Sequence, residues 1–279
     1  MRVGRIPYIN CFPVYGAIDR GLVALDGELV TGVPSALNRQ MAAGTLDVSV
    51  VSAVEYARDS RRYVLLPDLA ISCHGPVRSV LLFSRRPASA LGGRRVIVSR
   101  SSMTSVLLTE LLFESVWKAR PEFVPGDAEV SDIEGFPQEE HEARLVIGDA
   151  ALLLRTRGRE APDGVGYPYV YDLGLEWQAW TGLPFVFAVW VALRATPVAQ
   201  SLGAHASLIA SRDWGLAHLD ELSRQAAAQT GVPAGACRDY FRGLDYGLGI
   251  EYLGGLTEFF GRLAASGRVP ATQLQFLAA

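Results

Sequence analysis

The chain has 279 residues, of which 49% are hydrophobic and 20% are charged, and its formal net charge is −3. This length exceeds one average domain, and the composition is that of a chain with a well-buried core, which excludes a disordered protein. The small negative charge gives no general attraction to nucleic acid, so any site for an anion must be built locally.

The first part of the chain alternates apolar runs with helical segments. Residues 3–6 form a short apolar run that Pro7 ends, which predicts a first strand, and Pro13 stands where a helix can begin, because its missing N–H would be unpaired there. Another helix is predicted for residues 34–41, and the apolar run 46–52 predicts a buried strand that leads into a third helix. This alternation favours an α/β fold with parallel strands.

Two strongly β-forming runs, 77–83 and 185–193, bracket a central block that has strands and helices of its own. In that block, strands are predicted at 96–99 and 145–147, and each is followed by a helix. After residue 193 the pattern is mainly helical, with amphipathic segments near 198–211, 214–229, 234–242 and 249–264.

The bracketing runs predict that the chain crosses into a second lobe and returns. On this interpretation lobe one comprises residues 1–83 and 191–279, and lobe two comprises residues 84–190. Two neighbouring crossings form a hinge, because few residues then absorb the rotation that closes a cleft between the lobes. The alternative is a single doubly wound sheet.

Cysteines and histidines are few and scattered. Cys11, Cys73 and Cys237 are widely spaced and include no Cys-x-x-Cys pair, so neither a disulfide framework nor a metal site is predicted. The sequence contains no phosphate loop, no dinucleotide fingerprint after a strand and no nucleophile elbow, so no cofactor is predicted. The N-terminus lacks the apolar stretch of a signal peptide, and no apolar run could span a bilayer, which predicts a cytoplasmic protein without membrane contact.

Four predicted strand-to-helix junctions are rich in small hydroxyl or amide residues. In open α/β sheets, ligands bind beyond the carboxyl ends of the strands, where helix N-termini attract a carboxylate or phosphate. For any single junction a helix cap is the commoner explanation, but four of them, two in each predicted lobe, favour a cleft for a small anion. The junctions are residues 10–13, 49–52, 99–105 and 148–150.

Asn10 follows the first predicted strand, and its amide offers both a hydrogen-bond donor and an acceptor. It can hold a ligand hydroxyl in fixed geometry or bond its own backbone in an Asx-turn, and the two interpretations are equally supported. Ser79, at the first predicted crossing, can reach a ligand or sit on a polar strand face. Because Arg78 alternates with Ser79, only one of them is expected to face the cleft.

The segment 171–184 is rich in aromatic residues and has two interpretations. It can form a lid over a planar ligand, or it can form a helix that packs Leu175, Trp177 and Trp180 into the core, which is the commoner arrangement. His74 lies in a predicted loop, where it can act as a base or remain solvated.

Several segments, in the same order along nearly the whole chain, resemble one family of enzymes. That family is chorismate dehydratase of the futalosine route to menaquinone. The more specific segments are the turn Asn-Cys-Phe-Pro at 10–13 and Thr-Gly-Leu-Pro-Phe at 181–185. The others are residues 75–80, 147–152, 171–174 and 246–249.

The resemblance implies an α/β, two-lobed fold like that of the type II periplasmic binding proteins, with a ligand cleft between the lobes. It also implies a cytoplasmic enzyme, a carbon–oxygen lyase that eliminates water from chorismate to give 3-[(1-carboxyvinyl)oxy]benzoate. The ring becomes aromatic in this reaction, and the driving force of aromatisation means that neither a metal nor an organic cofactor is expected.

Matching motifs also imply roles for residues. Asn10 is expected to hold the departing hydroxyl, and Ser79 to orient the substrate or share that contact. The enolpyruvyl carboxylate of the substrate is expected to take the ring proton, with the protein mainly fixing geometry. The residues expected to bind the substrate are Ser49, Ser52, Ser102, Thr104, Ser105, Gly148 and Asp149.

Two alternatives share the same fold. A sister family acts later in that pathway on a cyclic futalosine-derived substrate, and its larger ligand needs room for a nucleoside-derived group. A non-catalytic small-anion-binding protein is the second alternative, but such proteins normally carry an export signal.

Overall fold

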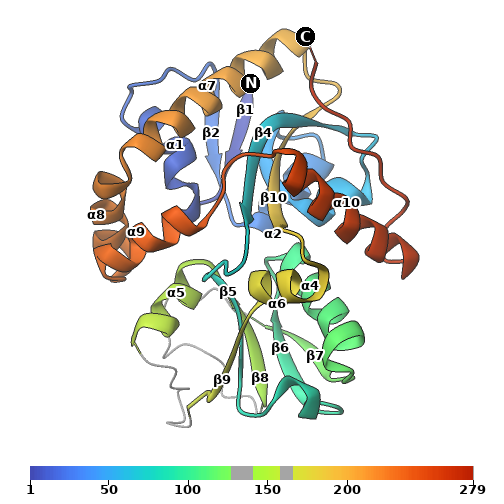
Figure 1. The fold of residues 1–279 in the computed structure, drawn as a ribbon. Coiled ribbons are helices and arrows are strands. Elements are labelled where there is room, and N and C mark those ends of the chain that lie inside the picture. The colour runs from blue at the N-terminus through green and yellow to red at the C-terminus, as the bar shows by residue number, and fades with distance from the viewer. Residues whose placement is uncertain (127–140, 158–165, 279) are drawn as a thin grey trace.

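Two five-stranded sheets divide the molecule into two lobes (Figure 1). The computed structural model describes residues 1–126, 141–157 and 166–278. We call the first sheet with its helices lobe one; its strands, in spatial order, are β2 (Glu28–Thr31), β1 (Arg2–Arg5), β3 (Val48–Ser52), β10 (Phe185–Leu193) and β4 (Tyr63–Cys73). Lobe two contains β7 (Glu122–Gly126), β6 (Arg95–Ser99), β8 (Ala143–Ile147), β5 (Val80–Ser84) and β9 (Tyr169–Asp172).

The helices lie where the apolar periodicity predicts them. Pro13 and Pro34 stand in the first turns of α1 (Phe12–Asp19) and α2 (Pro34–Ala42), where a missing N–H has no cost. The remaining helices of lobe one are α3 (Ala53–Arg58), α7 (Val198–Ala217), α8 (Leu219–Thr230), α9 (Ala234–Gly243) and α10 (Ile250–Ala265). Lobe two carries α4 (Met103–Leu112), which continues as a π-helical turn at Phe113–Trp117, and α5 (Gly148–Arg157). Helix α6 (Leu173–Thr181) lies between the last strand of lobe two and β10.

The prediction of parallel strands is only partly right. Strand β1 runs parallel to β2 and β3, and β6 runs parallel to β7 and β8. The strands that connect the lobes are antiparallel to their neighbours: β10 to β3 and β4, and β5 to β8 and β9. The cause is topological, because the chain leaves lobe one through β4 and returns through β10, and two adjacent strands with these roles must point in opposite directions.

The lobe boundaries predicted from the sequence fall inside two strands. The boundary after residue 83 cuts β5, which lies wholly in the second sheet, and the boundary after residue 190 cuts β10, which lies wholly in the first. The crossings themselves are residues 74–79 and 173–184. Both strands are buried along most of their length, so their apolar pattern is the same whichever sheet they join.

The sequence pattern does not predict β4, the longest strand of the first sheet. Pro67 and Asp68 interrupt its apolar run, and Asp68 adopts a left-handed φ of 54°. The register opposite β10 shifts at this point, from Ala70 opposite Val189 to Leu65 opposite Val191. Strand β4 therefore contains a bulge. The extra residues interrupt the apolar pattern by which a strand is predicted from the sequence.

The two crossings are bonded to each other through Asp172. Its carboxylate accepts the N–H groups of Val77 at 2.9 Å and Arg78 at 2.7 Å in the first crossing. It also caps α6 by accepting N–H bonds from Gly174 and Leu175 at 3.1 and 3.3 Å. Burial raises the pKa of Asp172, and the N–H groups of Arg78, Val77 and Leu175 oppose that shift. One side chain thus joins the two segments about which the lobes would rotate.

The aromatic segment forms α6, and its central ring belongs to the core. Trp177 is fully buried, donates from Nε1 to the carbonyl of Pro184 at 3.1 Å and packs edge-on against Phe185. Leu175, however, is 46% exposed, so the expectation that it packs into the core is wrong. The guanidinium of Arg262 on α10 lies 3.9 Å from the ring centre of Trp180 and covers that ring from lobe one.

Candidate active site

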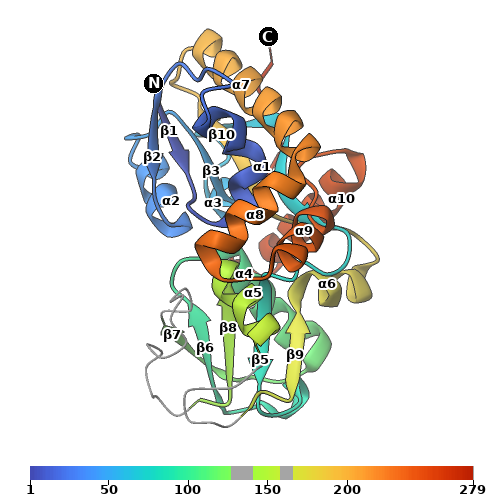
Figure 2. The same ribbon diagram turned by 90° about the vertical axis from the view of Figure 1, so that its left-hand side faces the viewer.

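A cavity of about 60 Å³ lies where the two lobes meet. The helices α4 and α5 of lobe two lie directly below lobe one in both side views (Figure 1 and Figure 2). The lining comes from the carboxyl ends of β3 and β8 and from the residues that follow β1, β6 and β8, as the rule for open α/β sheets requires. Parts of β4, β5, β10 and α2 and Ser79 of the first crossing complete it. Its residues are Ile6, Tyr8, Asn10, Pro34, Ser52, Ile71, Ser79, Val80, Ser102, Ser105, Ile147, Gly148, Phe187 and Ala188.

All four predicted junctions contribute to this one cavity. Six of the nine expected site residues line it, from both lobes: Asn10, Ser52, Ser79, Ser102, Ser105 and Gly148. Among the described residues, the lining contains no charged side chain. An anion in the cavity would therefore meet hydroxyl groups, an amide and the N-terminal ends of helices.

Asn10 lies in a short 3₁₀ turn, Ile9–Cys11, between β1 and α1. Its Oδ1 is buried and has no hydrogen-bond partner within residues 1–126, 141–157 and 166–278. An Asx-turn would pair this oxygen with a nearby backbone N–H, so the geometry does not support that interpretation. A buried acceptor without a partner is costly, and here it borders the cavity.

Ser79, rather than Arg78, borders the cavity. Its hydroxyl oxygen accepts a hydrogen bond from the Tyr240 hydroxyl at 2.8 Å, and its carbonyl accepts the N–H of Gly148 at 2.7 Å. Arg78 has a φ of 63° and lies against α9, where a Cβ on Gly243 would stand 1.8 Å from its guanidinium. Sequence reasoning missed Tyr240, because a tyrosine on the buried face of an amphipathic helix has the pattern of an ordinary core residue.

Ser102 and Ser105 serve both as a helix cap and as cavity lining. The Ser102 Oγ accepts the N–H of Ser105 at 3.3 Å and donates to its hydroxyl oxygen at 2.8 Å, which caps α4. The other N–H groups of the first turn of α4 have no helical partner, and the helix dipole makes this end attractive to a carboxylate. The capping and ligand-binding interpretations of this junction are therefore compatible.

Ser49 and Thr104 are two of the three expected residues that lie outside the lining. Ser49 is fully buried on β3 opposite Gly4 of β1, and its hydroxyl donates to the carbonyl of Val50 at 2.8 Å. The Thr104 hydroxyl oxygen accepts the N–H of Val54 at 3.2 Å, which joins α4 of lobe two to α3 of lobe one. Both residues follow the junction pattern, but alternation along a strand and rotation around a helix turn their side chains elsewhere.

Asn38 on α2 is a further residue that sequence reasoning missed. Its Oδ1 accepts the N–H of Ser52 at 3.2 Å, and its Nδ2 donates to the Ser52 hydroxyl oxygen at 3.1 Å. The same Nδ2 lies 3.3 Å from the sulfur of Met103 in lobe two. Asn38 is almost fully buried, and it fixes the position of a lining serine while it touches the opposite lobe.

Asp149 borders a neighbouring cavity of about 300 Å³, which shares Tyr8 and Ile147 with the first. Its Oδ1 accepts the N–H of Ile9 at 3.2 Å, a third contact between the lobes close to the site. Burial raises the pKa of this carboxyl to about 6, although the bond from Ile9 opposes the shift. Asp149 thus stands beside the Asn10 turn rather than in the lining of the smaller cavity.

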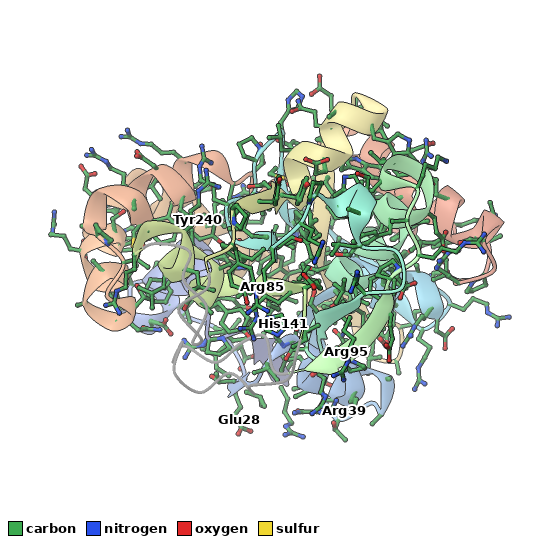
Figure 3. All side chains as sticks on the ribbon, turned by 90° about the horizontal axis from the view of Figure 1, so that it is seen from below. Glu28, Arg39, Arg85, Arg95, His141 and Tyr240 are labelled. Atoms are coloured by element: carbon green, nitrogen blue, oxygen red, sulfur yellow. The ribbon has the colours of Figure 1, made fainter. Side chains whose placement is uncertain are left out.

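Arginine side chains gather at the opposite end of lobe two. A cavity of about 460 Å³ there is lined by Arg85, Arg94, Arg95 and His141, together with Gly93 and Glu142, and Figure 3 labels three of these residues. Ser79 precedes β5 and Arg85 follows it, so the length of that strand, roughly 17 Å at 3.4 Å per residue, separates the two cavities. These arginines therefore do not serve the site between the lobes.

Across the described ranges, no three His, Cys, Asp or Glu side chains are grouped as the ligands of a metal ion would be. In those same ranges, no helix has the length and apolar character needed to cross a membrane. His74 is exposed and, like Arg78, is not among the lining residues.

The fold defines the class of protein. The crystal structure of a protein from Archaeoglobus fulgidus matches with a TM-score of 0.75 over 96% of this chain and 98% of its own, at 19% identity. The periplasmic aliphatic sulphonate binding protein SsuA of Escherichia coli matches with a TM-score of 0.63 over 97% and 93%, at 12% identity. A Candida albicans protein with the generic periplasmic binding protein fold matches with a TM-score of 0.59, at 10% identity over 100% and 97%. The chain has the two-lobed periplasmic-binding-protein fold, as expected.

The sequence comparison identifies the family within that class. The chorismate dehydratase of Thermus thermophilus is 30% identical over 237 residues, which are 81% of this chain and 84% of the relative. The chorismate dehydratase of Campylobacter jejuni is 29% identical over 194 residues, which are 67% and 66% of the two chains. Residues 1–265 match the menaquinone biosynthesis family, and the chain belongs to it.

Proposed function

We propose that this protein is a chorismate dehydratase, a carbon–oxygen lyase that eliminates water from chorismate to give 3-[(1-carboxyvinyl)oxy]benzoate. Membership of the menaquinone biosynthesis family and two relatives with that name support the assignment. The observation that carries it is the meeting of Asn10 and Ser79 in one cavity, with the buried Asn10 Oδ1 lacking a partner among the described residues. For a biosynthetic enzyme of this kind we also propose a cytoplasmic location.

The reaction needs one group that holds the departing hydroxyl and one that removes the neighbouring proton. The C4–O bond breaks and its electron pair leaves on oxygen, while the C3–H bond breaks and its electrons form the aromatic ring. The C3 proton ends on the departing oxygen, so one water is released and no oxidant is consumed. Asn10, with a donor and an acceptor on one side chain, can hold that oxygen through the change of charge.

The cavity lining contains no histidine and no carboxylate among the residues that the structure describes. The enolpyruvyl carboxylate of the substrate is therefore assigned as the base, since it sits next to the C3 proton. The protein then contributes mainly by fixing the reacting groups in a near-attack geometry. The N-terminal turn of α4, with Ser102 and Ser105, is assigned to a substrate carboxylate because its N–H groups and helix dipole favour negative charge.

Substrate entry requires the lobes to separate. The cavity of about 60 Å³ is far below the roughly 300–1,000 Å³ of ordinary small-molecule pockets. Val54 with Thr104 and Ile9 with Asp149 join the lobes close to the cavity, which is the arrangement of a closed cleft. Opening would rotate lobe two about the crossings that Asp172 ties together.

Purified protein incubated with chorismate tests the assignment, with the aromatic product followed by its ultraviolet absorbance and identified by mass. The Asn10→Ala variant is expected to lose kcat by about 100-fold or more, while the affinity for the product changes much less. Ser49→Ala, a serine of the same junction class buried outside the lining, is the control and should keep the wild-type kcat.

Three outcomes contradict the proposal in different ways. No aromatic product from the wild-type protein would refute the activity. Conversion of a cyclic futalosine-derived compound in place of chorismate would assign the sister activity. Weaker binding by Asn10→Ala at unchanged kcat would refute the role of Asn10 alone.

A further inference from the structure

Tyr240 contacts the candidate site through Ser79 and does not itself line the cavity. It projects from α9 of lobe one, is labelled in Figure 3 and is 1% exposed. Its hydroxyl oxygen lies 2.8 Å from the Ser79 Oγ, and Ser79 is itself 3% exposed. Tyr240 is not one of the lining residues, so any effect it has on a bound substrate must pass through Ser79.

Hydrogen bonds from both lobes hold Ser79 in place and leave its hydroxyl proton available to a ligand. The N–H of Gly148 fixes the Ser79 carbonyl from lobe two, and Tyr240 fixes the hydroxyl oxygen from lobe one. A serine hydroxyl has one proton to donate and two positions that accept. Tyr240 occupies one accepting position of the oxygen, and the Ser79 proton is left for a ligand in the cavity that this serine lines.

The two hydroxyl groups are not equivalent as donors. A phenol is far more acidic than an alcohol and is therefore the stronger donor of the pair. Burial raises the pKa of Tyr240, so the phenol keeps its proton at neutral pH. When Tyr240 donates to Ser79, the serine keeps its own proton for a partner in the cavity.

We propose that Tyr240 is a positioning residue that fixes the Ser79 hydroxyl as a hydrogen-bond donor to the departing hydroxyl of the substrate. This inference rests on the proposed dehydratase activity. The Oδ1 of Asn10 can accept the proton of the substrate hydroxyl, and Ser79 donates to its oxygen. As the C4–O bond breaks, negative charge grows on that oxygen, so the Ser79 donor contributes more in the transition state than in the bound substrate.

The test is a double-mutant cycle of Tyr240→Phe and Ser79→Ala, with kcat and KM for chorismate measured for all four proteins. Tyr240→Phe removes only the hydroxyl. It is expected to lower kcat about 10-fold with little change in KM. In the S79A background, Tyr240→Phe should change kcat by less than about 2-fold, because the residue through which Tyr240 acts is gone.

Tyr246→Phe is the matched control. Tyr246 is 2% exposed and lies close enough to Tyr240 to interact with it electrostatically. Its hydroxyl has no partner within the described ranges. Tyr246→Phe therefore removes the same group, a buried phenolic hydroxyl, without affecting Ser79. The variant is expected to keep the wild-type kcat. Circular dichroism and urea denaturation confirm that each variant is folded.

The outcomes separate this inference from the activity on which it rests. An equal loss of kcat from Tyr240→Phe in the wild-type and S79A backgrounds would overturn it, and so would a rise in KM alone. A similar loss from Tyr246→Phe would also overturn it, since the effect would then come from packing. No turnover by the wild-type protein would refute the dehydratase assignment, and this inference with it.

Discussion

Replacing Asp149 by asparagine is expected to stabilise the protein at neutral pH. The Asp149 carboxylate accepts the N–H of Ile9 at 3.2 Å, and burial raises its pKa from the usual 3.8 to about 6. Asparagine keeps an oxygen that can accept the same bond and removes the buried charge. The neighbouring groups that interact with Asp149, Cys11, Cys237 and Tyr240, stay neutral because burial raises their pKa values too.

The size and sign of the effect follow from proton linkage. A carboxyl whose pKa is higher in the folded state binds more protons when folded, so its contribution to stability falls as the pH rises. The fall begins near pH 3.8, is complete above about pH 6 and leaves the ionised, buried group as a cost at neutral pH. At about 1.4 kcal/mol per pKa unit the whole loss is about 3 kcal/mol, of which about 1.4 kcal/mol falls between pH 5 and pH 8.

Urea denaturation at pH 5, 6, 7 and 8 measures the free energy of unfolding of both proteins. The advantage of Asp149→Asn over the wild type is expected to grow by about 1.4 kcal/mol across this range. Asp26→Asn removes an exposed carboxylate and is the control, for which the difference should stay constant. A constant difference for Asp149→Asn would refute the reasoning, because the carboxyl would then have the same pKa in the folded and unfolded states.

Two further predictions concern packing at the crossings and the limits of the cavity. Gly174→Ala is expected to lower the free energy of unfolding by about 1–3 kcal/mol, because the added Cβ would lie 2.5 Å from the carbonyl oxygen of Gly75. Gly254→Ala on α10, where a Cβ meets nothing within 4 Å, should raise it by about 0.5–1 kcal/mol; equal losses in urea denaturation would contradict this. Ser52→Ala should raise KM for chorismate about 3- to 10-fold, whereas Ser49→Ala should leave it unchanged, and an equal rise in steady-state kinetics would place Ser49 in the site.

Local sequence patterns predict most of the elements. Pro13 and Pro34 mark the first turns of α1 and α2 because a proline has no N–H to lose there, and amphipathic periodicity predicts the four helices after residue 193. The pattern fails at β4, where the bulge at Pro67 and Asp68 breaks the alternation. The break is compensated by pairing with β10 and by backbone hydrogen bonds to Tyr246 and Gln275, all of which are distant in sequence.

The candidate site was predictable as a set of junctions but not as a set of contacts. Asn10, Ser52 and Ser102 carry a local signal, because small polar residues between a strand and a helix either cap the helix or face a ligand. Ser49 carries the same signal and points elsewhere. The choice depends on which face of the strand the partner sheet covers, and a single segment holds no information about that.

By itself, the sequence determined the class of fold, the segments that alternate between strand and helix, and the small polar residues at the ends of the strands. Only the tertiary structure decided which of them meet. It placed β5 and β10 in different sheets, joined the crossings through Asp172 and brought Tyr240 to Ser79 across 161 positions of chain. Short-range patterns encode backbone conformation, whereas a cavity between lobes is made of contacts whose partners are far apart in sequence.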